Sequence, residues 1–73
     1  MSDVTTVDAR GLSCPEPVLR TRQAIAHLQR GTVEVLVDSV ASRDNVSRLA
    51  EKAGWQVVAE PRSDGSFRVL LTK

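Results

Sequence analysis

The stretch Val33-Glu34-Val35-Leu36-Val37, which runs into Asp38, is the clearest secondary-structure signal in the chain. A segment with the β-branched residue valine at every second position predicts a strand. Alternate side chains of a strand point to opposite faces of its sheet, so the three valines are expected to share one face.

On the N-terminal side of this strand, the sequence predicts an amphipathic helix from Pro15 to Arg30, ended by Gly31. Apolar and small side chains keep to one helical face, which holds Val18, Thr21, Ala24, Ile25 and Leu28. Polar side chains take the other face, which holds Arg20, Arg22, Gln23, His27 and Arg30. Farther upstream, Val4 to Asp8 is β-branched and predicts a short first strand.

On the C-terminal side, a second helix is predicted from the apolar spacing of Val46, Leu49, Ala50 and Ala53. Ser42 is its expected N-cap and Gly54 its stop. Two extended segments, Trp55 to Glu60 and Ser66 to Thr72, then flank residues 61–65, which contain an Asp-Gly turn signal. The chain is therefore expected to close as a β-hairpin.

The predicted order is βαβαββ, in a single domain spanning residues 1–73. Periodicity does not fix whether the two helices share a face of the sheet. A chain this small favours an α/β (α+β) two-layer sandwich, because two helices cover only one sheet face well. The other face is then partly bare, and Leu36, Val58 and Leu70 form an apolar stripe there unless they pack at the edge of the core.

Composition excludes several classes of function. The chain has a net charge of +1 and only two aromatic residues, which argues against a primary nucleic-acid binder. One cysteine and one histidine cannot supply the ligands of a zinc site, so no metal is expected. The sequence has no apolar run that could span a membrane and no signal peptide, and its lone cysteine forms no disulfide framework, so we expect a cytoplasmic protein. We also expect a monomer.

The lone thiol, Cys14, is the candidate reactive group. It directly precedes Pro15-Glu16-Pro17, and prolines this close together fit only the first turn of a helix. A helix start favours the thiolate, and the nearby arginines Arg10, Arg20 and Arg22 act in the same direction, whereas Glu16 opposes them. The alternative is a buried, inert cysteine, which the flanking prolines and the loop at Gly11 disfavour.

The lack of partner groups near this thiol limits the reactions that it can carry out. The chain has no second cysteine for a dithiol redox couple. His27 lies thirteen residues along the predicted helix, about 20 Å away at 1.5 Å per residue, and cannot act as its base. Cys14 is therefore suited to accepting and donating a group.

The stretch Gly11-Leu12-Ser13-Cys14-Pro15-Glu16-Pro17-Val18, followed by Val37-Asp38, a second helix and Gly54, resembles the TusA/SirA family of sulfur carriers. The resemblance implies a mixed four-stranded sheet, with a fold similar to the C-terminal domain of a translation initiation factor. It also implies that Cys14 accepts a persulfide sulfur from a cysteine desulfurase or rhodanese and passes it to an acceptor protein. Such a protein is a carrier with covalently held sulfur, without another cofactor, rather than an independent turnover enzyme.

Partner docking is expected around this thiol. The family's aspartate after the second strand matches Asp38, and Arg43 and Asp44 follow it closely. Parallel β-α topology brings such segments to one sheet edge. Together with Arg10, Arg20 and Arg22, these residues are candidate docking residues.

The destination of the sulfur stays open between tRNA thiolation, a molybdenum-cofactor pathway and dissimilatory sulfur metabolism. Residues 45–48 are closer to the YedF-like branch of the family, which leaves a regulatory or selenium-linked binding module without sulfur relay as the alternative. A single-stranded RNA-binding module rests on fold analogy alone, and the near-neutral charge argues against it.

Overall fold

A computed structural model describes residues 4–12, 16–28 and 30–73, and its elements follow the order β1, α1, β2, α2, β3, β4. Their bounds are β1 Val4–Asp8, α1 Glu16–Ala26, β2 Thr32–Val37, α2 Val40–Lys52, β3 Gln56–Pro61 and β4 Phe67–Thr72. The predicted βαβαββ order is confirmed.

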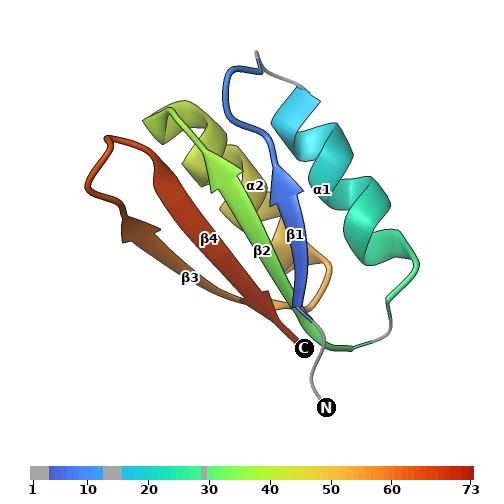
Figure 1. The fold of residues 1–73 in the computed structure, drawn as a ribbon. Helices are drawn as coiled ribbons and strands as arrows, with labels where there is room; N and C mark the ends of the chain where they lie inside the picture. The colour runs from blue at the N-terminus through green and yellow to red at the C-terminus, as the bar shows by residue number, and fades with distance from the viewer. Residues whose placement is uncertain (1–3, 13–15, 29) are drawn as a thin grey trace.

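The four strands form one mixed sheet in the order β1-β2-β4-β3. β1 pairs with β2 in parallel, and α1 provides the crossover connection that a parallel pair needs, whereas the other two pairings are antiparallel. Both helices lie on the same face of the sheet, α1 beside β1 and β2 and α2 over β3 and β4 (Figure 1). The two-layer sandwich expected from chain length is confirmed.

The core lies between the sheet and the two helices. The three valines of β2 that were predicted to share a face are all fully buried. The helices contribute Thr21 and Ile25 from α1, on the predicted inner face, and Val46 and Ala50 from α2. Thr21 is accommodated because its hydroxyl donates to the Pro17 carbonyl at 2.8 Å, one helical turn earlier.

The end of α1 differs from the prediction. The helix stops at Ala26 rather than at Arg30, and Gly31 is not its cap. Gly31 instead exchanges two backbone hydrogen bonds with Lys73, each of 3.0 Å, which continues the pairing of β2 with β4. The segment before β2 is therefore committed to the sheet, and the helix has to end earlier.

The start of α2 also differs. Ser39, not Ser42, is the N-cap: its backbone is extended and its hydroxyl accepts from the Ser42 amide at 3.1 Å. Ser42 lies one turn inside the helix, buried, with its own hydroxyl 2.9 Å from that of Ser39. The second helix thus begins almost directly after β2, and the apolar spacing around Val46 missed its first turn.

The predicted hairpin is confirmed, with Gly65 at a positive φ of 87° in its turn. Its strand bounds shift by one residue, because Pro61 closes β3 and Ser66 precedes β4. Pro61 is tolerated because β3 is an edge strand.

The sheet face opposite the helices carries the expected apolar positions. Val58 is 54% exposed, whereas Leu36 and Leu70 are half-buried. Charged side chains break this stripe, since Arg68 lies 2.5 Å from a Glu34 oxygen and 3.8 Å from one of Glu60. The uncovered face is therefore mixed apolar and ionic rather than continuously apolar.

Candidate functional site

Cys14, the residue on which the functional prediction depends, lies outside the described residues together with Ser13 and Pro15. The described chain reaches Leu12 on one side and resumes with α1 at Glu16 on the other. The loop after β1 and the first turn of α1 both lie at the end of the sheet where the parallel strands β1 and β2 end (Figure 1). Ligand and partner sites of α/β folds commonly form at this end.

Gly11 and Asp38 are brought together although 27 residues separate them in the sequence. The Gly11 amide donates to Asp38 Oδ2 at 2.6 Å, so the side chain after β2 holds the loop that follows β1. Gly11 has a φ of 77°, and a Cβ added there would meet no atom of the described residues within 4 Å. Glycine is thus required by backbone conformation rather than by space.

Arg10 forms a second tie in the same loop. Its guanidinium donates to both carboxylate oxygens of Asp8 at 2.9 Å, and its amide donates to Asp8 at 3.2 Å. These hydrogen bonds lower the pKa of Asp8 to about 2, and the same pairing raises the pKa of Arg10. Arg10 is therefore engaged with its own loop, which the docking prediction did not foresee.

The tip of the β3–β4 hairpin also approaches this loop. Asp64 lies 3.9 Å from the Arg10 guanidinium. Hydrogen bonds from the Ser66 hydroxyl and amide lower the pKa of Asp64 and hold its carboxylate in place. Nothing in the linear sequence connects Arg10 with a turn more than fifty residues later, so only the sheet order could reveal this contact.

The start of α1 combines a buried proline with exposed charges. Pro17 is fully buried, so it fixes the helix start by packing as well as by its backbone. Glu16 and Arg20 are about half exposed and lie 3.9 Å apart on neighbouring turns. Arg22 is exposed farther along the helix. Arg20 and Arg22 are therefore exposed on α1, and Glu16 offsets part of their positive charge.

Arg43 and Asp44 lie in the first turns of α2, and they form an ion pair with each other at 3.0 Å. The Arg43 guanidinium also stacks over the Phe67 ring at 5.0 Å, at the start of β4. These contacts attach the pair to the hairpin side of the molecule. Arg10 is part of the loop leading to Cys14, and among the described contacts Asp38 is the docking candidate that binds this loop from another segment.

The described residues contain no group of three or more His, Cys, Asp or Glu side chains placed to hold a metal ion. No helix in residues 4–12, 16–28 and 30–73 is long and apolar enough to cross a bilayer. The loop that precedes the Cys14 segment is held by the hydrogen bond from Gly11 to Asp38, and the helix that follows it is anchored by the buried Pro17.

Comparison with known proteins identifies the family of this chain. The family model described as sulfurtransferase TusA matches residues 5–73, which is nearly the whole chain. The chain belongs to the TusA family. The resemblance drawn from the residues around Cys14 is confirmed.

Individual TusA-family relatives agree with this assignment. A candidate sulfur carrier protein of Methanocaldococcus jannaschii is 35% identical over 68 residues, which cover 92% of this chain and 91% of the relative. Another from Archaeoglobus fulgidus is 37% identical over 67 residues, covering 89% and 87%. The crystal structure of a SirA-like protein from Desulfitobacterium hafniense superposes with a TM-score of 0.89 at 38% identity, covering 96% of both chains. Family and relatives together support a sulfur carrier role.

Proposed function

We propose that Cys14 carries sulfur as a persulfide between a donor enzyme and an acceptor protein. The observation that carries the proposal is the combination of TusA-family membership with a single cysteine, which lies in the sequence two residues before the helix that begins with Glu16 and Pro17. The fixed loop before Cys14 supports it, because a thiol that meets two different partners benefits from a defined position.

The transfer balances without an external oxidant. The Cys14 thiolate attacks the terminal sulfur of a donor cysteine persulfide, of the kind formed on a desulfurase or rhodanese. A new S–S bond forms at Cys14 while the donor's S–S bond breaks, and the donor cysteine leaves as a thiolate. The acceptor thiolate then repeats the same attack on the Cys14 persulfide. Cys14 ends as a thiolate, ready for the next cycle.

The helix start is the proposed source of thiolate stabilisation. The partial positive charge of a helix N-terminus favours the thiolate over the thiol. Arg20 adds positive charge one turn into α1, partly offset by its contact with Glu16 at 3.9 Å. We therefore expect the thiol to become reactive below the free-cysteine pKa of about 8.5.

The test is intact-protein mass spectrometry after incubation with a cysteine desulfurase and cysteine. The wild-type chain should gain the mass of one sulfur atom, and a thiol reductant should remove it. Because the chain has one cysteine, any such gain assigns the sulfur to Cys14.

Cys14→Ser is the matched control, since serine is favourable at a helix N-terminus and should leave the fold intact. The variant should gain no sulfur while retaining the wild-type circular dichroism spectrum. If the wild type gained no sulfur from any desulfurase or rhodanese, the carrier proposal would be rejected, and the regulatory module would replace it.

A further inference from the structure

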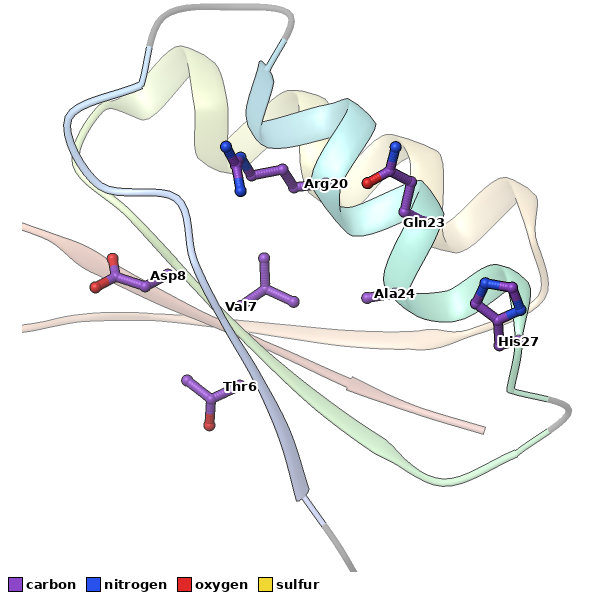
Figure 2. A pocket seen from close by; sticks show the side chains of 7 residues that line it. All are labelled: Thr6, Val7, Asp8, Arg20, Gln23, Ala24 and His27. Carbon is purple, nitrogen blue, oxygen red and sulfur yellow. The ribbon is translucent and has the colours of Figure 1, made fainter.

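A groove of about 430 Å³ runs between β1 and α1, on the side of the molecule away from β2. Its strand wall is Thr6, Val7 and Asp8, and its helix wall is Arg20, Gln23, Ala24 and His27. Figure 2 shows the helix side chains lining the upper side, whereas the Thr6 and Asp8 side chains point away from α1. The backbone of β1 therefore forms part of the lower wall.

β1 is an edge strand, so alternate residues present their backbone groups to its free side. The Ala9 amide donates to the Leu36 carbonyl of β2 at 2.8 Å. By alternation, Val7 also bonds toward β2, and Thr6 and Asp8 direct their amides and carbonyls into the groove. In the part of the chain that the structure describes, no strand lies on that side.

The groove also has a distinct chemical pattern. Val7 is half-buried and shares the helix-facing side of β1, and Ala24 contributes a small, half-buried side chain opposite it. Polar donors lie on both sides of this apolar centre, Arg20 toward one end and His27 toward the other (Figure 2). The Arg20 side chain is about half exposed, and among the described residues its ionic contact is the one to Glu16 at 3.9 Å, so it is accessible to an incoming anion.

We propose that this groove binds an extended acidic peptide, which adds to β1 as a fifth strand. Backbone bonds to Thr6 and Asp8 supply the pairing, as in other cases of strand addition to an exposed sheet edge. A small apolar side chain of the peptide lies over Val7 and Ala24. Acidic side chains two residues before and after it meet Arg20 and His27.

The dimensions agree with this assignment. Arg20 and His27 are seven residues apart on the chain, about 10.5 Å at the rise of an α-helix. Strand residues at i−2 and i+2 are about 13 Å apart, which flexible side chains bridge to the two helix positions. A compact anion would contact one end of the groove and leave the strand edge unpaired.

The probe is the synthetic peptide acetyl-SETVTES-amide, titrated into the isotopically labelled full chain and followed by amide NMR. The amides of Thr6 and Asp8 should shift, and the affinity follows from the titration. The peptide acetyl-SKTVTKS-amide, which has lysines in place of both glutamates, should bind wild type at least fivefold more weakly.

Arg20→Glu should weaken binding of the acidic peptide by about fivefold or more and should strengthen binding of the lysine peptide. Arg22→Glu is the matched control, because it makes the same charge change on the same helix outside the groove lining. It should change either affinity by less than twofold. Equal effects of the two substitutions would overturn the assignment to this groove.

Thr6→Pro tests the strand pairing, because it deletes an amide that faces the free edge and leaves the bonds to β2 in place. It should abolish binding of the acidic peptide. A peptide N-methylated at the amides flanking its valine provides the same test on the unmodified protein. Binding that survives N-methylation would overturn strand addition.

Further outcomes would also reject the proposal. Sodium acetate producing the same shifts would indicate a simple anion site, and concentration-dependent shifts at Thr6 without peptide would indicate that a second copy of the chain occupies the edge. Cys14→Ser should bind the acidic peptide like wild type, since the proposed contacts come from β1 and from Arg20, Ala24 and His27 of α1. Peptide binding and sulfur loading therefore succeed or fail independently.

Discussion

Asp38 has a negative charge and a hydrogen-bond acceptor. The acceptor holds the loop, and the charge is available for docking. Its Oδ2 accepts from the Gly11 amide at 2.6 Å, which fixes the loop leading to Cys14. Its charge is expected to take part in partner docking. Asparagine keeps an acceptor oxygen and removes the charge, whereas alanine removes both.

Asp38→Ala should lower the free energy of unfolding by about 1 kcal/mol, a usual cost for a lost hydrogen bond. Asp38→Asn should cost less than half of that, and urea denaturation measures both. Sulfur transfer should slow in both variants if docking uses the charge. Wild-type stability in Asp38→Ala would show that the bond to Gly11 contributes nothing to the fold.

Asp8 makes the stability of the protein depend on pH in the acid range. Its folded-state pKa is about 2, below the ordinary value of 3.8, because Arg10 donates to its carboxylate. A lowered pKa contributes stability that is complete above the unfolded value and is lost as the pH falls through the folded one. The contribution of Asp8 should therefore disappear between about pH 4 and pH 2.

The check is the melting temperature of wild type and Asp8→Asn across this range. The melting temperature of wild type should exceed that of Asp8→Asn by a constant amount above about pH 5, and this difference should shrink steadily toward pH 2. Other carboxylates titrate in both proteins and cancel in the difference. A difference that does not change with pH would contradict the effect of the Arg10 pairing.

At the scale of elements, the strand-to-helix junction between β2 and α2 positions Asp38. Ser39 caps α2 directly after Asp38, with its hydroxyl accepting from the Ser42 amide. A misplaced cap would shift the start of the helix and with it the direction of the Asp38 side chain. The junction therefore links helix stability to the geometry of the site.

Ser39→Ala should lower the free energy of unfolding by about 1 kcal/mol, because an N-cap hydroxyl satisfies an otherwise free helix amide. Urea denaturation followed by circular dichroism measures the change. Ser63→Ala, an exposed serine in the hairpin turn, is the control and should change stability by less than about 0.5 kcal/mol. If both substitutions had the same effect, Ser39 would not be a stabilising cap.

At the scale of the whole molecule, the two opposite ends of the folded domain have different roles. One end holds Gly11, Asp38 and the N-terminus of α2, next to Leu12, the last described residue before Cys14. The opposite end holds Lys52, in the last turn of α2, and the bonds between Gly31 and Lys73. We expect sulfur donors to dock at the first end.

Arg22→Glu should slow sulfur transfer from a desulfurase, because it reverses a charge on the helix that follows Cys14. Raising the ionic strength from 0.1 M to 1 M shortens the Debye length from about 10 Å to about 3 Å. This change should slow sulfur transfer to the wild-type protein by a similar amount. Lys52→Glu is the matched control and should have little effect. If neither the charge reversal nor the added salt changed the rate of sulfur transfer, we would place docking on the uncovered sheet face around Val58.

The sequence alone determined the element order, the inner face of α1, the closing hairpin and the family. These features depend on periodicity, glycine and proline placement, and the Gly-Leu-Ser-Cys-Pro-Glu-Pro-Val motif, all of which are local in the chain. Helix ends were less predictable. Gly31 was expected to cap α1, but its pairing with Lys73 depends on a strand that forms forty residues later.

Only the tertiary structure decided which polar groups from distant parts of the chain contact one another. The bond from Gly11 to Asp38 and the contact of Arg10 with Asp64 join segments that are distant in sequence. The groove beside β1 likewise exists because β1 is an edge strand with α1 beside it, a consequence of strand order. Local patterns specify elements, but the contacts between elements follow from how the sheet is assembled, which no local pattern records.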